Sequence, residues 1–299
     1  MKNILFTGVI PALTTPFCKD ESIDLVAWKK WISWHDRQSS RAVVLFGSTG
    51  EGISLTFSEK ELLLKTARKC LQSTAMIVGV SAPTTDMAII QAEQAKSLGA
   101  QAILLTTPYY VRPDQNGLCQ HYLKISQAVK MPIIMYTVPS RTGMDLADNT
   151  IITLAQDSNI VGIKDASGRI ERMERIVKET PDSFIYLAGN DMEITENLDR
   201  EGDGVISVLA NILPNLMQSI VANYKSNQQW AKGKFADLSL LLEELARNGN
   251  PQVIKHMVKS TFSISSTMRL PLTNVDQETQ TAIELSLRNS GIVPEEISQ

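Results

Sequence analysis

Eight short apolar segments alternate with longer segments of helical character, and this alternation limits the fold more than any other feature of the sequence. Short runs of β-branched and apolar residues between turn residues predict strands. Strands that alternate with helices predict a parallel sheet, and eight such units match a closed (β/α)8 TIM barrel. The predicted strands span residues 9–16, 42–46, 76–80, 102–106, 133–138, 160–164, 184–188 and 204–208.

The strand pattern stops near residue 212, and residues 231–248, 253–262 and 276–290 have the pattern of helices. We therefore expect an α/β chain with a catalytic barrel over residues 1–225 and a helical C-terminal extension over residues 226–299. An open, doubly wound sheet would show the same alternation. Its nucleotide-binding fingerprints, GxGxxG and GxxxxGK[ST], are absent from the sequence, which disfavours that fold.

The composition excludes several classes of function. The chain of 299 residues has a formal net charge of −3 and no long run of lysine and arginine, so we expect it to bind neither nucleic acid nor an anionic membrane. No apolar run is long enough to span a membrane, and the N-terminus lacks the apolar core of a signal peptide. We expect a soluble protein of the cytoplasm.

The cysteines and histidines do not have the spacing of a metal site. The three cysteines are Cys18, Cys70 and Cys119. Their odd number and wide spacing predict reduced, partly buried thiols. The three histidines are His35, His121 and His256. Each is expected to be a surface or interface residue, and the reaction is expected to need no metal and no cofactor.

Lys164 stands inside an apolar strand, in the segment Ile-Val-Gly-Ile-Lys-Asp at residues 160–165. An ammonium group buried in hydrocarbon costs several kcal/mol unless it is paired or loses its proton, and a neutral lysine amine can form a Schiff base with a keto acid. Strand alternation places Ile160 and Gly162 on the face of Lys164, with Val161 on the other face. Gly162 would leave room beside the amine. The alternative is a structural lysine that reaches solvent from the strand end.

Other reactive side chains follow the ends of the neighbouring strands, where the catalytic groups of a barrel lie. Residues 47–51, Gly-Ser-Thr-Gly-Glu, form a turn whose amides and hydroxyls suit a carboxylate, although such turns are also common in ordinary loops. A phenol at a strand end can serve as an acid or a base, and a guanidinium group can pair with a carboxylate. The strand-end rule therefore predicts one rim that carries Ser48, Thr49, Tyr110, Tyr136, Arg141 and Lys164.

Five motifs extend over most of the chain in a fixed order. They are Gly-Ser-Thr-Gly-Glu at 47–51, Thr-Pro-Tyr-Tyr at 107–110, Pro-Ser-Arg-Thr-Gly at 139–143, Gly-Ile-Lys-Asp-Ala-Ser-Gly at 162–168 and Gly-Val-Ile-Ser at 204–207. With these motifs the chain resembles the dihydrodipicolinate synthase (4-hydroxy-tetrahydrodipicolinate synthase) family of the pyruvate-dependent class I aldolases. The resemblance implies a lyase of lysine and diaminopimelate biosynthesis that condenses pyruvate with L-aspartate-4-semialdehyde.

The resemblance also implies catalytic roles for four residues. Lys164 would form the Schiff base with pyruvate, and Tyr136 would move the proton. Ser48 would relay the proton, and Tyr110 would complete the relay from the neighbouring subunit. A chain of hydroxyl groups can carry protons in a site that is closed to bulk water.

Four further residues are implied to bind the substrates. Thr49, Gly189 and Ile206 would line the pyruvate pocket. Arg141 would bind the carboxylate of aspartate-semialdehyde at the mouth of the site.

Two departures from the family pattern leave a second activity open. Ser48 stands where the family more often has threonine, and Thr137 stands where it often has asparagine. Sialic acid lyases of the same superfamily also carry the serine, so a sugar-acid aldolase is the second hypothesis. Arg141 and its Pro-Ser-Arg-Thr-Gly segment favour the synthase. A third hypothesis, a catalytically silent barrel that serves as a binding or scaffold protein, is disfavoured by the intact set of Lys164, Tyr136 and Thr49.

The resemblance implies an assembly as well. If Tyr110 crosses to a partner's site, the working unit is at least a dimer, and the family's usual form is a homotetramer of two tight dimers. Lysine-inhibited relatives bind lysine at the tight-dimer interface through polar and acidic groups. This chain keeps one residue of that region and differs at four others, so weak or absent inhibition by lysine is expected. The retained residue is Tyr109, and the four others are Phe57, Lys60, Pro83 and Met87.

Overall fold

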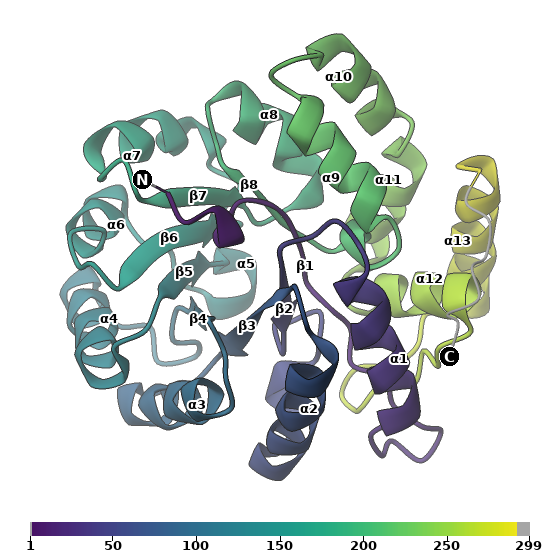
Figure 1. Cartoon of the computed structure of the whole chain (residues 1–299), viewed down its shortest axis with the longest axis horizontal. Coiled ribbons are helices and arrows are strands. Elements are labelled where there is room, and N and C mark those ends of the chain that lie inside the picture. The colour runs from purple at the N-terminus through teal and green to yellow at the C-terminus, as the bar shows by residue number, and fades with distance from the viewer. Residues whose placement is uncertain (1, 292–299) are drawn as a thin grey trace.

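Eight parallel strands form a ring in the computed structural model, which describes residues 2–291 (Figure 1). The strands are β1 Gly8–Pro11, β2 Ala42–Leu45, β3 Ala75–Val80, β4 Ala102–Thr106, β5 Ile133–Thr137, β6 Ile160–Asp165, β7 Ile185–Ala188 and β8 Gly204–Ser207. Hydrogen bonds join them in the order β1, β8, β7, β6, β5, β4, β3, β2. Between β1 and β2, Ala12 bridges to Val44, and the N–H of Leu13 donates to the Val44 carbonyl at 2.9 Å. The predicted TIM barrel is confirmed.

Helices cover the outside of the ring (Figure 1), and several begin at a side-chain cap. At the start of the second helix, Thr56 Oγ1 accepts from the N–H of Glu59, and the Glu59 carboxylate accepts from the N–H of Thr56. The helices are α1 Leu25–Asp36, α2 Phe57–Cys70, α3 Thr85–Ser97, α4 Gln115–Val129, α5 Pro139–Thr142, α6 Asp148–Leu154, α7 Met173–Glu179, α8 Ile194–Asp199, α9 Pro214–Asn223, α10 Gln228–Ala236, α11 Ser239–Asn248, α12 Gln252–Phe262 and α13 Gln277–Asn289.

Two apolar layers explain why the strands are apolar on both faces. The inner layer fills the barrel with alternate strand residues such as Val44, Ile77 and Leu104. The outer layer lies between the strands and the helices and includes Val43 and Met76. Because the strands are covered on both sides, polar groups are concentrated at the strand ends.

The strand β6 departs from the predicted alternation. Its pairing with β5 shifts register between Ile160 and Gly162 and leaves Val161 out. Ile160 lies in the outer layer and Val161 packs against the inner one, so the prediction was wrong for these two residues. A bulge adds one residue to a strand and reverses the faces of the residues on one side of it.

Gly162 also has a structural role that the prediction did not include. A Cβ atom at this position would lie 2.5 Å from the carbonyl oxygen of Ile185 in β7. Glycine therefore allows β7 to approach β6 closely. The expected role, to leave room beside the Lys164 amine, stays a prediction.

Within residues 2–291, helices follow β8 and form no second sheet, as predicted. The predicted helix over residues 231–248 is two helices, α10 and α11, separated by residues 237–238. In α12, the Phe262 ring packs against the Trp31 ring of α1 with the centroids 5.2 Å apart. Residues 292–299 of the predicted extension lie outside the described residues. Within residues 2–291, no helix has both the length and the apolar character needed to span a membrane.

A buried ion pair joins α12 to the turn after β2. Lys255 Nζ lies 2.6 Å from Glu51 Oε1, and both side chains are at most 1% exposed. The same ammonium group donates to the Thr267 carbonyl at 2.6 Å and lies 4.3 Å from the centroid of the Phe17 ring. Burial lowers the pKa of Lys255, and the charge of Glu51 opposes this shift. Breaking such a pair by removing one partner is strongly destabilising, so this contact holds the C-terminal helices to the barrel.

The histidine prediction was wrong within this chain, whereas the cysteine prediction is confirmed. Cys18, Cys70 and Cys119 are free and half-buried. His35, His121 and His256 are all buried. An imidazole ring is largely apolar and can pack in a core when it stays neutral, as His35 does against the ring of Trp31 with the centroids 4.5 Å apart.

Burial of His35 predicts a loss of stability in mild acid. Burial lowers its pKa to about 3, whereas the unfolded chain binds this proton near pH 6.5. As the pH falls below 6.5, the unfolded state gains the proton first, so the free energy of unfolding decreases. This histidine alone accounts for about 2 kcal/mol between pH 7 and pH 5. Urea unfolding at the two pH values measures the loss, and His35→Leu should reduce it by that amount. An unchanged loss in the variant would contradict the assignment.

Candidate active site

A cavity of about 370 Å³ opens at the carboxyl ends of the strands. Six of the eight residues predicted for the site line it, namely Ser48, Thr49, Tyr136, Arg141, Lys164 and Gly189. They come from β5, β6 and the segments after β2, β5 and β7. The strand-end rule therefore locates the site, as expected for a barrel.

Lys164 and Tyr136 face each other across two neighbouring strands. The two residues are register partners in the ladder between β5 and β6. Lys164 Nζ lies 4.3 Å from the centroid of the Tyr136 ring. Lys164 is 5% exposed, and among the described residues its side-chain amine has no hydrogen-bond or ion-pair partner. An amine in this setting is available as a nucleophile on the cavity side.

The turn after β2 presents the hydroxyl groups of Ser48 and Thr49 to the cavity. The N–H of Gly50 donates to the Gly47 carbonyl at 3.1 Å, and Thr15 Oγ1 donates to the Gly50 carbonyl at 2.7 Å. The backbone of Glu51 has φ 52°, in the left-handed region, and its carboxylate pairs with the Lys255 ammonium group. In the part of the chain that the structure describes, no direct hydrogen bond joins the Ser48 and Tyr136 hydroxyls. The backbone of the turn is therefore fixed by groups outside the cavity, and among the described residues the Ser48 hydroxyl has no hydrogen-bond partner.

The wall opposite this turn is built by Gly189 and Asp191 after β7. The N–H of Gly189 donates to the Asp165 carbonyl at 2.6 Å, and a Cβ atom at this position would lie 2.6 Å from the Cβ of Ala166. Asp191 Oδ2 accepts from the N–H groups of Val208 and Leu209 at 2.8 and 2.9 Å. Burial raises the pKa of Asp191 above its usual range. This carboxylate joins the segment after β7 to the segment after β8.

Arg141 lies at the mouth of the cavity, in the short helix α5. It is exposed to solvent, and its guanidinium group donates to the Asn250 carbonyl at 2.6 Å. The side chain of Asn250 donates to Thr49 Oγ1 at 2.9 Å. Asn250 therefore connects the mouth of the cavity to its floor, although it belongs to the segment between α11 and α12.

Two predicted site residues do not line the cavity of this chain. Tyr110 lies in the segment after β4, but its side chain is 92% exposed and its backbone has φ 72°. Ile206 is buried in the inner layer of the barrel, beside Ile10 of β1. Val208, two residues after Ile206, lines the cavity instead.

Sequence reasoning missed Asp191 and Asn250. Asp191 follows the seventh strand by three residues, so the strand-end rule applied to that strand would have identified it. Asn250 has no comparable signal, because it lies in the C-terminal helical segment and reaches the cavity only through the tertiary fold. Among residues 2–291, no group of three or more histidine, cysteine, aspartate or glutamate side chains could hold a metal ion.

The chain is similar in sequence and structure to proteins of one family. The model of the dihydrodipicolinate synthetase family matches residues 5–290. The 4-hydroxy-tetrahydrodipicolinate synthase of Thiobacillus denitrificans is 36% identical over 288 residues, which cover 96% of this chain and 97% of the relative.

Two solved structures superpose over nearly the whole chain. A chloride-inhibited dihydrodipicolinate synthase from Acinetobacter baumannii, complexed with pyruvate, has a TM-score of 0.92 and 35% identity, and the match covers 96% of this chain and 99% of that one. A monomeric dihydrodipicolinate synthase variant has a TM-score of 0.93 and 32% identity, with 97% and 98% covered. Both similarities include the barrel and the C-terminal helices.

Proposed function

The chain belongs to the dihydrodipicolinate synthetase family, and from this premise we propose that it condenses pyruvate with L-aspartate-4-semialdehyde through a Schiff base on Lys164. The protein is a lyase of lysine and diaminopimelate biosynthesis. The observation that supports the role of Lys164 best is its unpaired amine, which faces the cavity above the Tyr136 ring. The relatives reported above are synthases, so a sugar-acid aldolase is not favoured.

Imine formation is the first step of the proposed reaction. The Lys164 amine adds to the C2 carbonyl carbon of pyruvate, and one water leaves as the C=N bond forms. The pyruvate methyl carbon then loses a proton and becomes an enamine carbon, which attacks the aldehyde carbon of the second substrate. The amine of that substrate next adds to the imine carbon and displaces Lys164, which closes the ring of 4-hydroxy-tetrahydrodipicolinate.

Proton transfer is assigned to hydroxyl groups. The Tyr136 hydroxyl serves as the acid and base next to the imine, and Ser48 passes the proton on. The two side chains line the same cavity but are not bonded to each other, which supports a third hydroxyl between them. Tyr110 of a second copy of the chain supplies that group in this proposal, because Tyr110 is exposed and lies outside its own cavity.

The carboxylates of the two substrates, pyruvate and aspartate-semialdehyde, are assigned to opposite ends of the cavity. Thr49 and Gly189 line the part next to Lys164 and receive the pyruvate carboxylate and methyl groups. Ile206 supports this pocket from the inner layer below it. Arg141 receives the carboxylate of aspartate-semialdehyde at the mouth, where a guanidinium group can form two parallel hydrogen bonds.

The proposal also covers the oligomeric state, the cellular compartment and the domain limits of the protein. The exposed side chain of Tyr110 stands beside Val111, which is 53% exposed, and such apolar groups favour contact with a second copy. We assign the protein to a homotetramer of the cytoplasm, with a barrel over residues 1–225 and an extension over residues 226–299. Weak or absent inhibition by lysine stays a prediction.

Trapping with borohydride tests the central step. Incubation with pyruvate and sodium borohydride should add one reduced adduct per chain at Lys164, and Lys164→Ala should abolish it. Lys255 is an internal control, because its Nζ also lies 4.3 Å from an aromatic centroid but is paired with Glu51. Peptide mass spectrometry locates the adduct. Modification of Lys255, or of any lysine other than Lys164, would refute the assignment.

Replacement of Arg141 tests the substrate assignment. Arg141→Ala should raise the KM for aspartate-semialdehyde and leave the KM for pyruvate nearly unchanged. Loss of a hydrogen-bonded charge costs about 1.5–3 kcal/mol, or roughly 10- to 100-fold in kcat/KM for that substrate. Arg247→Ala is the control, because Arg247 is exposed nearby on α11 and does not line the cavity. Equal effects of Arg141→Ala on both substrates would indicate a structural role.

Subunit complementation tests the crossing of Tyr110. Lys164→Ala and Tyr110→Phe should each be nearly inactive alone. A dimer that contains one chain of each kind has one complete site, so random pairing should restore about a quarter of the parent activity. Sedimentation of the parent should show a dimer or larger species. No restored activity in a co-purified mixed dimer, or an active monomer of the parent, would contradict the crossing.

A further inference from the structure

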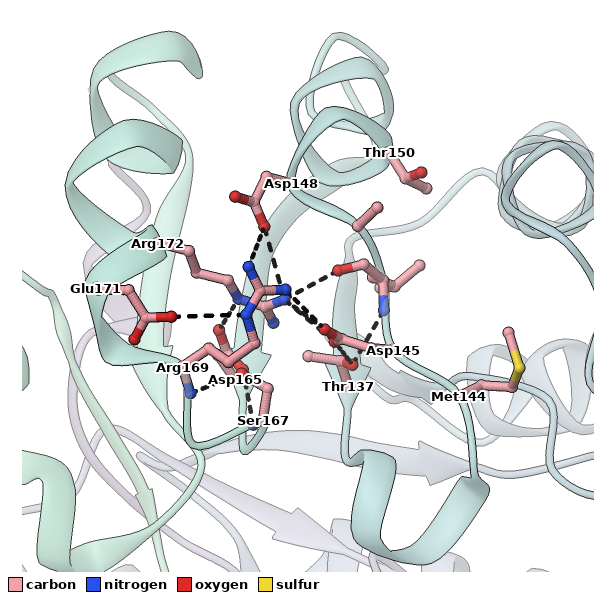
Figure 2. A network of polar contacts seen from close by, with 12 residues as sticks. Thr137, Met144, Asp145, Asp148, Thr150, Asp165, Ser167, Arg169, Glu171 and Arg172 are labelled. Atoms are coloured by element: carbon pink, nitrogen blue, oxygen red, sulfur yellow. Dashed lines mark hydrogen bonds and ion pairs between the residues drawn. The ribbon is translucent and has the colours of Figure 1, made fainter.

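A polar network that includes Thr137 and Asp165 (Figure 2) lies at the ends of β5 and β6, the two strands that carry Tyr136 and Lys164. The next residue on each strand, Thr137 on β5 and Asp165 on β6, points away from the cavity into this network. Thr137 and Asp165 are register partners, as Tyr136 and Lys164 are. Each catalytic side chain therefore has a neighbour in the network one residue further along its strand.

Arg172 is the centre of the network. It ends the short helix η3, Ile170–Arg172, and its side chain is 1% exposed. Its Nε donates to Asp165 Oδ2 at 2.7 Å. One terminal nitrogen donates to Asp145 Oδ2 at 2.9 Å and to the Leu146 carbonyl at 3.0 Å. Figure 2 shows these contacts as they converge on one guanidinium group.

The carboxylates of Asp145 and Asp165 extend the network to β5, to β7 and to the segment after α5. Asp145 Oδ1 accepts from Thr137 Oγ1 at 2.9 Å, which connects Arg172 to the end of β5. Asp165 also accepts a hydrogen bond from the buried Tyr186 hydroxyl of β7. Residues 145–146 follow α5, the helix that carries Arg141. Arg172 is thus linked to the segments that carry Tyr136, Arg141 and Lys164.

The network matters because a bulge interrupts the ladder between β5 and β6. The bulge at Val161 leaves four register pairs between it and the strand ends, from Ile134 with Gly162 to Thr137 with Asp165. The charge of Arg172 is retained in the buried network, since burial disfavours the charge but the hydrogen bond and charge of Asp165 raise its pKa above the usual value. A planar guanidinium group can bind two carboxylates in fixed directions, and an ammonium group cannot.

We propose that Arg172 is a positioning residue, whose guanidinium group holds the ends of β5 and β6 so that Lys164 stays over Tyr136. The inference rests on the proposed role of Lys164 in Schiff-base formation. A small displacement of reacting groups can cost up to about a hundredfold in rate. Loss of the guanidinium group should therefore slow imine formation more than it weakens pyruvate binding.

The test compares Arg172→Lys with Arg175→Lys. Arg175 lies on α7 and donates from two nitrogens to a single carboxylate, that of Glu179, at the exposed surface. For each variant we would measure urea unfolding, the single-turnover rate of pyruvate trapping at saturation, and kcat and KM. Arg172→Lys should fold cooperatively, trap pyruvate about 10- to 100-fold more slowly and keep its pyruvate KM within roughly threefold. Arg175→Lys should match the parent in every measurement.

Three results would overturn the proposal. They are a trapping rate of Arg172→Lys within twofold of the parent, an equal loss in Arg175→Lys, and a rise in pyruvate KM that accounts for the whole loss. If Arg172→Lys does not fold, Thr137→Val replaces it, because it removes only the hydroxyl that joins β5 to Asp145. That variant should trap pyruvate about threefold to tenfold more slowly, and an unchanged rate would refute the proposal. A parent protein that traps no pyruvate would instead refute the proposed function and the inference with it.

Discussion

The ladder between β5 and β6 determines where the two central groups of the candidate site lie. It places Tyr136 beside Lys164 inside the barrel, and it places Thr137 beside Asp165 outside. Side chains alternate across a strand, so one register places one polar pair on the cavity face and a second polar pair on the opposite face. The inner pair has an unpaired amine and faces the cavity, whereas the outer pair is bonded to Arg172 and Asp145. The site therefore combines a free reactive group with a hydrogen-bonded support one residue away.

Two buried lysines show how surroundings rather than burial alone direct lysine chemistry. The ammonium positions of Lys164 and Lys255 both lie 4.3 Å from an aromatic centroid. Lys255 is bonded to Glu51 and to a backbone carbonyl, so its donors are used inside the core. Lys164 has no such partner among the described residues and borders the cavity. A lysine therefore stabilises the C-terminal helices through an ion pair at position 255, and at position 164 it can attack a keto acid.

The parts of the fold that follow from local pattern could be predicted from the sequence. The eight strands and the rim residues at their ends were predictable because apolar periodicity and the strand-end rule need no knowledge of long-range contacts. The bulge at Val161 was not predictable, because two strands of different length must be paired before the extra residue is evident. His35 packs against Trp31 of its own helix, and Trp31 packs in turn against Phe262 of α12, a contact that only the tertiary fold makes, so the burial of this histidine was not predictable. Asn250 was missed for the same reason.

The position of Asn250 changes the physical description of the C-terminal helices. Its side chain bonds Thr49 on the floor of the cavity, and its carbonyl accepts from Arg141 at the mouth. The ion pair of Lys255 and Glu51 fixes the same turn from the opposite side, only five residues further along the chain from Asn250. The turn after β2 is thus held between two contacts from the C-terminal segment. Loss of the Lys255 charge alone would leave the Glu51 carboxylate buried without its partner, and a buried unpaired charge costs several kcal/mol. The helices after β8 are therefore part of the structure that shapes the site, although no strand of the barrel requires them.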